Sequence, residues 1–209
     1  MPGTQLLRSS SIVDDINTMH KSGLASLAFH YFDFRDAKNN ELRGLLSSLL
    51  FQLCNQSDSY CNALSSLYST HQNGTQSADD GALLECLQDM LSSVDQVPVY
   101  LILDALDECP NGSGTPSPRE EVLMFVEDLV NLQLPNLRIC LTSRPEVDIQ
   151  EILEPLGFHS ISLHDEEGQK QDILDYVRSV VLSDIRMRKW KEVDKELVID
   201  VLSQKADGM

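Results

Sequence analysis

The sequence predicts an α/β protein in which helices alternate with the strands of a mostly parallel sheet, forming a three-layer α/β/α sandwich. Two observations carry this prediction. Short, almost wholly apolar segments recur along the chain, as expected for strands buried on both faces of a parallel sheet. Between them lie longer segments with apolar residues every three or four positions, a pattern typical of helices. Strands are expected near residues 24–33, 99–104, 137–142 and 159–163.

The expected helices fill the intervals between these strands. The clearest covers residues 42–53, where leucine recurs at helical spacing, and Asn40 is expected to cap it. The helix over residues 118–132 begins with a proline and two glutamates, which suit the positive end of a helix dipole. The other helices are expected over residues 9–21, 60–68, 82–94, 147–156, 169–182 and 193–206.

Composition and charge exclude several classes of protein. A chain of 209 residues can bury a sizeable core as one domain. The formal net charge of −17 argues against a surface for nucleic acid or for an anionic membrane, because both need concentrated Lys and Arg. No apolar run is long enough for a transmembrane helix, and no signal peptide opens the chain. The five cysteines are odd in number and lack C-x-x-C spacing, which favours free thiols in the cytoplasm over a zinc site.

The most informative segment is Val99-Tyr-Leu-Ile-Leu-Asp-Ala-Leu-Asp-Glu-Cys109. Its apolar run ends at Asp104, and Asp107 and Glu108 follow directly. Acids at the C-terminal end of a buried strand lie where open α/β sheets bind ligands. Such acids can hold a hydrated Mg²⁺ and orient a water beside a triphosphate. The alternative is a core strand that ends in a solvated acidic turn, which explains one aspartate more easily than three acids.

A second segment, Leu137-Arg-Ile-Cys-Leu-Thr-Ser-Arg-Pro-Glu146, is another apolar strand that ends in polar residues. Arg144 precedes a proline, and this position is biased toward an extended backbone. A guanidinium at the strand end could reach a γ-phosphate and stabilise charge in the transition state. Taken alone, Arg144 is better explained as a surface arginine in a strand-to-helix turn, and it gains weight only together with the acids after the preceding strand.

The two strand ends, in this order, resemble the NACHT-type domains of the STAND class of P-loop NTPases. The resemblance is closest to the large fungal family with nephrocystin-like N-terminal modules. Other segments that take part in it are Phe29-His-Tyr-Phe-Asp-Phe-Arg-Asp36, the helix over residues 42–53 and the closing Lys205-Ala-Asp-Gly-Met209.

This resemblance assigns a role to each polar residue at the strand ends. It implies that Asp104 corresponds to the Walker B aspartate, which holds Mg²⁺ through water. Asp107 and Glu108 would complete the metal site and polarise the attacking water, and Arg144 would be the sensor arginine. The cofactors implied are Mg²⁺ with ATP or GTP, and the residues leave the choice of nucleotide open.

The phosphate loop of the family, G-x-x-G-x-G-K-[ST], has no counterpart in residues 1–15. Aligning the following helix puts Thr4 and Gln5 where the glycine and lysine should stand, and Leu6 where the Mg²⁺-binding hydroxyl should stand. Only Gly3 is a candidate survivor of the loop. Because glycines let backbone N–H groups approach the phosphates and the lysine supplies charge, we expect weak or no nucleotide binding. The strand that precedes the loop in the family is expected to be missing as well.

The resemblance also implies a domain division, with a partial NTPase core over residues 1–183 and the start of a helical lid over residues 184–209. Complete relatives use nucleotide binding and hydrolysis as a switch that biases assembly with like subunits. Three interpretations of this chain stay open. The first is a nucleotide switch domain that is inactive alone, and the second is a catalytically inactive remnant that acts as a protein-interaction module. The third, a generic α/β protein with coincidental motifs, is disfavoured because two motifs occur in the correct order.

Overall fold

The computed structural model describes residues 3–35, 40–71, 74–93, 97–112, 114–161 and 167–205. The chain is an α/β protein with a three-stranded parallel sheet. It divides into two compact units, Pro2–Phe158 and His159–Met209, which we describe separately. The predicted boundary between a partial NTPase core (residues 1–183) and the start of a helical lid (residues 184–209) stays a prediction.

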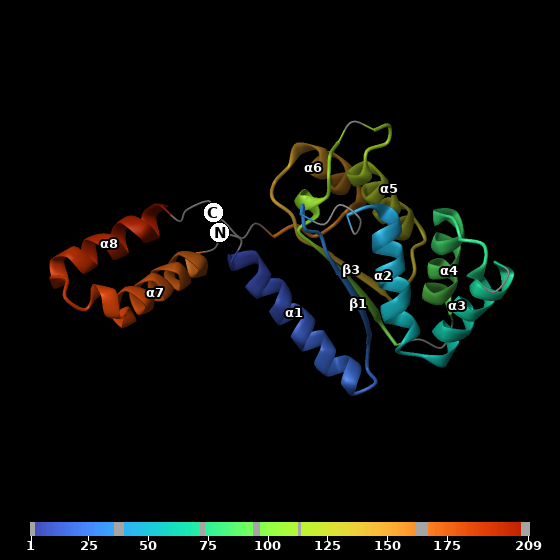
Figure 1. Ribbon diagram of the computed structural model, residues 1–209, viewed down its shortest axis with the longest axis horizontal. Coiled ribbons are helices and arrows are strands. Elements are labelled where there is room, and N and C mark those ends of the chain that lie inside the picture. Colours follow the sequence, from blue (N-terminus) through green and yellow to red (C-terminus); the bar gives the residue numbers. More distant parts are fainter. Residues whose placement is uncertain are drawn as a thin grey trace. The chain divides into compact units, whose positions relative to one another are not determined.

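The sheet has the strand order β1-β2-β3, with β2 (Val99–Asp104) between β1 (Ser26–Tyr31) and β3 (Leu137–Leu141). Figure 1 labels the two outer strands, β1 and β3. Both pairings are parallel. Tyr31 is the register partner of Asp104, and Leu141 is the partner of Leu103. The C-terminal ends of all three strands therefore lie at one edge of the sheet, and three of the four predicted strands are confirmed.

The fourth predicted strand, over residues 159–163, is not formed in its described part. Residues 159–161 have neither helical nor strand backbone, and residues 162–163 lie outside the described part of the chain. Ile161 is 64% exposed. The apolar side chains of this segment are not buried as those of a sheet strand would be. Alternation of apolar and polar residues over five positions is therefore weak evidence for a strand.

The larger core lies on one face of the sheet. The helices α2 (Leu42–Cys54) and α5 (Pro118–Asn131) cover this face. Two further helices, α3 (Asp58–Thr70) and α4 (Asp80–Ser92), pack against α2, and α6 (Val147–Leu153) packs against α5. The apolar stripe of α2 is buried as its spacing predicts, through Leu45, Leu46, Leu49, Leu50 and Leu53.

The opposite face carries α1 (Gly3–Lys21), which begins six residues before the predicted start at Ser9. Val13 and Ile16 of this helix are buried in a second, smaller core against Leu27 and Ile102. Helices therefore lie on both faces of the sheet, and this arrangement matches strands that are apolar on both faces.

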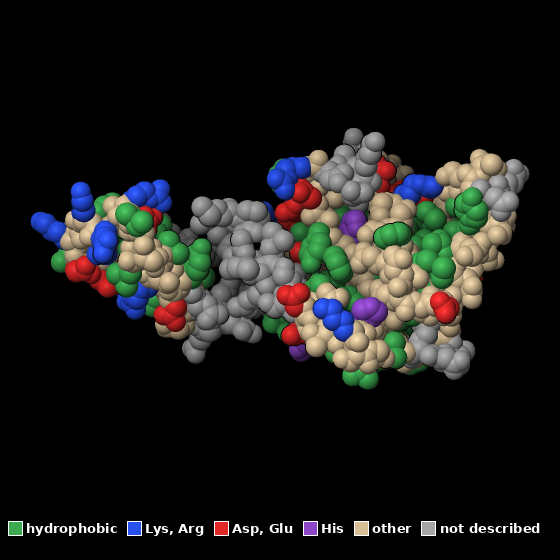
Figure 2. Space-filling view, turned by 60° about the horizontal axis from the view of Figure 1, so that its bottom comes forward, with side chains coloured by type: hydrophobic (Ala, Val, Ile, Leu, Met, Phe, Trp, Pro, Cys, Tyr) green, Lys and Arg blue, Asp and Glu red, His purple; other side chains and the backbone are tan. Residues whose placement is uncertain are grey.

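The unit over His159–Met209 contains two helices, α7 (Glu167–Ser183) and α8 (Glu192–Lys205), joined through a short 3-10 turn. Val181 and Ile199 are buried between them. Several large apolar side chains remain exposed, and Figure 2 shows apolar groups at the surface of this unit. Within the described residues, no helix is long and apolar enough to cross a membrane.

The outer edge of β1 is closed by side chains of α2 and of the turn after it. The Leu27 N–H donates to Gln56 Oε1 over 2.9 Å, and Gln56 Nε2 donates back to the Leu27 carbonyl. Gln52 makes the same pair of bonds with Phe29, at 3.0 and 2.7 Å. Each amide thus replaces one residue of a neighbouring strand, so the edge of β1 is not available for pairing.

Replacing Gln56 with alanine should lower the free energy of unfolding by about 1–2 kcal/mol, because the Leu27 N–H and carbonyl lose their partners. Urea denaturation followed by circular dichroism measures this change. Gln150→Ala, at an exposed position of α6, is the matched control and should stay within about 0.5 kcal/mol of the unchanged protein. Equal effects of the two substitutions would contradict the role of Gln56 as an edge cap.

Candidate functional site

The C-terminal ends of β2 and β3 are joined through Thr142. Asp104, the last residue of β2, is only 3% exposed, and its Oδ1 accepts a hydrogen bond from the Thr142 hydroxyl. The same hydroxyl oxygen accepts the N–H of Ala105 over 3.0 Å, and the Thr142 N–H donates to Leu103. The Asp104 carboxylate is therefore held in one orientation at the end of the sheet.

A tight turn after Asp104 carries the next two acids. Ala105 has a left-handed backbone, with φ 57° and ψ 47°, which costs about 1–2 kcal/mol for a residue with a Cβ. The fully buried Leu106 follows, and its N–H donates to the Thr142 carbonyl over 2.9 Å. Burial of Leu106 offsets the backbone cost and places Asp107 and Glu108 on a 3-10 turn beside the strand ends.

Asp107 and Arg144 form an ion pair across the gap between β2 and β3. Asp107 Oδ1 accepts the backbone N–H of Arg144 over 3.0 Å, and Asp107 Oδ2 lies 3.4 Å from Arg144 Nε. The aspartate side chain is 8% exposed, whereas the arginine side chain is 66% exposed. The guanidinium is thus held at one nitrogen and stays accessible to a ligand at the edge of the sheet.

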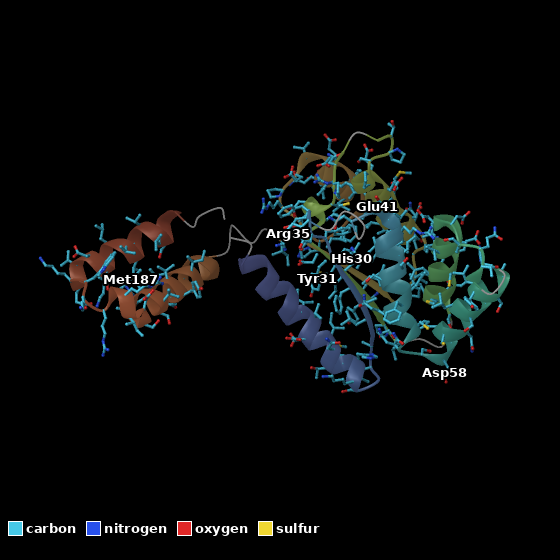
Figure 3. The ribbon with its side chains drawn as sticks, viewed as in Figure 1. His30, Tyr31, Arg35, Glu41, Asp58 and Met187 are labelled. Atoms are coloured by element: carbon cyan, nitrogen blue, oxygen red, sulfur yellow. The ribbon has the colours of Figure 1, made fainter. Side chains whose placement is uncertain are left out.

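Glu108 connects this turn to the loop that follows β1. Its Oε2 accepts the N–H of Phe34 over 3.4 Å. In the same loop Arg35 pairs with Asp33 at 2.6 Å and lies 5.8 Å from the centre of the Phe34 ring. Figure 3 shows Arg35 close to the end of β1 marked by His30 and Tyr31. All four predicted residues of the strand ends therefore lie at the same edge of the sheet.

Asn40 shapes the β1 loop and does not cap α2. The N-cap position belongs to Glu41, whose side chain makes no capping hydrogen bond. Asn40 is fully buried, and its side-chain amide bonds the N–H and the carbonyl of Asp33. Its own carbonyl accepts the thiol hydrogen of Cys109 over 3.2 Å. The predicted cap was wrong because a buried partner seven residues upstream outcompetes the local helix end.

Arg119, a residue that sequence analysis missed, supports the backbone of the turn that carries Asp107 and Glu108. Its guanidinium donates to the carbonyls of Asp107 and Cys109, at 2.6 and 3.0 Å, and pairs with Asp148 at 3.0 Å. The Arg119 side chain is 10% exposed. Its only sequence signal is an arginine in the first turn of a helix, where the dipole disfavours a cation.

The donor set at this edge consists of carboxylate and hydroxyl oxygens, which suit Mg²⁺. Among the described residues, no group of three or more His, Cys, Asp or Glu side chains is arranged to hold a metal ion directly. Mg²⁺ usually keeps several waters and binds through one or two carboxylates together with substrate phosphates. The residues fit a hydrated ion held through water at Asp104, and this role stays a prediction.

Gly3, Thr4 and Gln5, the residues aligned with the phosphate loop, form the first turn of α1. Their backbone is helical, and their side chains lie outside the described part of the chain. Their assignment as a degenerate phosphate-binding segment stays a prediction.

Substituting Arg119 with methionine should lower the free energy of unfolding by about 3 kcal/mol, because the carbonyls of Asp107 and Cys109 and the half-exposed Asp148 carboxylate lose the guanidinium that bonds them. Chemical denaturation measures the loss. Arg138→Met is the matched control, since Arg138 is exposed and bonds only nearby carbonyls, and it should change stability by about 0.5 kcal/mol at most. Similar losses for both variants would show that Arg119 does not hold the turn.

The Asp33 carboxyl should titrate well below an ordinary aspartate. The hydrogen bond from the Arg35 side chain lowers the pKa of Asp33 to about 2. This lowering favours the folded state above about pH 4, and the contribution is lost as the pH falls through about 2. Carboxyl ¹³C NMR should show the low midpoint, and Arg35→Gln should raise it. Arg43→Gln, which removes an exposed pair with Asp80 elsewhere, should leave the Asp33 midpoint unchanged.

Comparison with known proteins gives one match. The family model described as Nephrocystin 3, N-terminal, matches residues 7–144. These residues include all three strands and the four polar residues at their ends. No curated protein and no solved structure matches the chain. Because the matched residues make up more than half of the sequence, the chain belongs to the Nephrocystin 3, N-terminal family.

Proposed function

We propose that this chain carries the metal-binding and sensor half of a nucleoside-triphosphate-binding switch domain, of the NACHT type within the STAND class of P-loop NTPases. The proposal rests on one observation. Asp104, Asp107, Glu108 and the exposed guanidinium of Arg144 lie at the C-terminal edge of a parallel sheet, where Asp107 pairs with Arg144. Open α/β sheets bind their ligands at this edge.

Each residue at the edge would have a different role in phosphoryl transfer. Asp104, fixed by Thr142, would orient the water shell of Mg²⁺, which supplies positive charge near the phosphates when it is bound. Asp107 and Glu108 would polarise the attacking water. Arg144 would keep its Nε contact with Asp107 and offer its other two guanidinium nitrogens to a γ-phosphate.

The free edge of β3 is where the phosphate-binding half would join. Within the described residues, no strand pairs with this edge, and the alternation of a parallel ladder directs the N–H and carbonyl of Ile139 toward it. The opposite edge of the sheet is closed by Gln52 and Gln56. An added strand carrying the phosphate loop would therefore pair with β3 and complete a three-layer sandwich of the P-loop type.

The second candidate is a protein-interaction module without catalytic activity, supported by the same open edge of β3. An exposed strand edge can pair with a strand of another chain. Nucleotide titration in the presence of Mg²⁺ separates the two functions. The five free thiols agree with a cytoplasmic location under either proposal.

The chain of 209 residues should hydrolyse ATP or GTP no faster than a variant carrying Asp104→Asn and Glu108→Gln. Positioning and charge stabilisation are most of what a protein contributes to phosphoryl transfer, and the sequence has no G-x-x-G-x-G-K-[ST] loop. Release of inorganic phosphate measures the rate. Robust turnover that the two substitutions abolish would mean that another group replaces the loop lysine.

Fusing a strand and an authentic phosphate loop ahead of residue 1 should raise the unfolding midpoint. Saturating Mg²⁺–ATP or Mg²⁺–GTP should raise it by a further ~5 °C or more, because a ligand that binds only the folded state stabilises it. Differential scanning calorimetry measures both effects. The same fusion with the loop lysine replaced by alanine is the matched control and should lose most of the nucleotide effect. An equal nucleotide shift in the unfused chain would place binding elsewhere.

A further inference from the structure

The connection between α7 and α8 carries the densest group of cations in the chain. Residues 185–191 read Ile-Arg-Met-Arg-Lys-Trp-Lys and hold four of the 16 lysines and arginines, with no acid among them. The connection begins with the 3-10 turn Ile185–Met187, and Met187 marks it in Figure 3. We call residues 184–195 the hairpin tip.

The acids on either side of this basic segment are already paired. Asp184 Oδ2 lies 2.8 Å from a guanidinium nitrogen of Arg186, and Glu192 Oε1 lies 2.7 Å from Lys195 Nζ. Asp194 is the remaining acid of the hairpin tip. The other three cations are exposed and have no ion-pair partner among the residues that the structure describes: Arg188, Lys189 and Lys191.

Three large apolar side chains project from the same segment. Ile185 is 82% exposed, Val193 is 79% exposed and Trp190 is 46% exposed. The backbone that carries them is held by its own hydrogen bonds, since the Met187 N–H donates to the Asp184 carbonyl and the Trp190 N–H to the Met187 carbonyl, both over 3.0 Å. The hairpin tip therefore presents apolar groups and unpaired cations together on an ordered turn.

We propose that the hairpin tip binds the surface of an anionic lipid bilayer. The three unpaired cations would contact the lipid phosphates and carboxylates, and the three exposed apolar side chains would enter the boundary between headgroups and acyl chains. The proposal does not depend on the nucleotide-binding function.

The formal net charge of −17 does not decide the binding of this segment. That charge is a sum over the whole chain, whereas five cations outnumber three acids within the hairpin tip. Charges separated by more than a Debye length, about 8 Å at physiological ionic strength, are largely screened from one another. Binding to a charged surface is therefore governed by the groups that lie nearest to it.

The apolar side chains favour a lipid partner over other polyanions. A nucleic acid backbone would attract the cations but would leave Ile185 and Val193 in water. A bilayer offers anionic headgroups and an apolar layer a few ångströms apart, so both kinds of side chain find partners. Tryptophan is also enriched where the headgroups meet the acyl chains, because its ring is apolar and its N–H is polar.

The test uses the fluorescence of Trp190, the single tryptophan of the chain. The whole chain is mixed with vesicles of phosphatidylcholine that contain about one quarter phosphatidylserine, and with vesicles of phosphatidylcholine alone. The expected result is a blue shift of the emission and co-sedimentation with the anionic vesicles only. Both effects should weaken as salt is added, because salt screens the attraction.

Two triple variants make the result specific. Replacing Arg188, Lys189 and Lys191 with glutamine should weaken vesicle binding by about 100-fold, because each cation near an anionic surface contributes roughly a factor of five. The matched control replaces three exposed cations of the other unit with glutamine, Lys21, Arg43 and Arg138, and so changes the net charge equally. It should bind within about 3-fold of the unchanged chain. Circular dichroism should show unchanged helix content in both variants.

The contribution of the apolar side chains is tested separately. Ile185→Ser combined with Val193→Ser keeps every charge and should weaken vesicle binding by about 10-fold or more, because less apolar area enters the bilayer.

Four outcomes would overturn the proposal: no binding to either kind of vesicle, equal binding to both kinds, equal losses in the two triple variants, or a Trp190 shift with soluble polyglutamate or RNA but not with anionic vesicles. The last would assign the hairpin tip to an acidic protein or to a nucleic acid.

Discussion

The backbone hydrogen bonds of β2 are the constraint on which the rest of the structure depends. A parallel strand buried on both faces must find partners on both sides, because an unpaired buried N–H or carbonyl is costly. β1 and β3 supply those partners in register, and this brings Tyr31, Asp104 and Leu141 to one edge of the sheet. The same requirement at β1 is met by the amides of Gln52 and Gln56 and not by another strand. The two edges of the sheet thereby differ, and among the residues that the structure describes the β3 edge is the one left without a partner strand.

The candidate site depends on buried polar side chains that hold its acidic residues and loops in place at the sheet edge. Thr142 fixes Asp104, Asn40 fixes the loop after β1, and Arg119 fixes the carbonyls of the acidic turn. Arg119 holds the backbone of the turn, and the carboxylates of Asp107 and Glu108 bond the N–H groups of Arg144 and Phe34. Such supporting bonds are typical of sites that must stay ordered while charged side chains meet a ligand.

The sequence predicted the elements whose cause is local. Runs of apolar residues predicted β1, β2 and β3, and helical spacing of leucine predicted α2. The ends of two strands also predicted that three acids and Arg144 would lie at one edge of the sheet, where Asp107 pairs with Arg144. Long-range partners left no such pattern: Gln56 bonds Leu27, 29 residues away, and Arg119 bonds Asp148, also 29 residues away. Asn40 was assigned to the adjacent helix because local capping rules ignore a buried partner in a folded loop. The segment 159–161 shows the opposite error, a local alternation that tertiary packing does not use.

Electrostatics supports the proposal that the acids at the strand ends would not bind a nucleotide without a phosphate loop and its lysine. A triphosphate is a polyanion, and the edge presents Asp104, Asp107 and Glu108 on a chain with a formal net charge of −17. The exposed guanidinium of Arg144 pairs with Asp107, and that of Arg35 pairs with Asp33. Repulsion between the phosphates and the acids must be offset by a cation that both can share and by donors that approach the phosphates directly. Arg144 cannot supply both, because part of its charge is already neutralised by Asp107 at 3.4 Å. A glycine-rich loop with its lysine, next to β3, would add the missing donors on the side of the site that the described residues leave open. The charge balance of the strand ends therefore supports the proposal that these residues form one half of a nucleotide site.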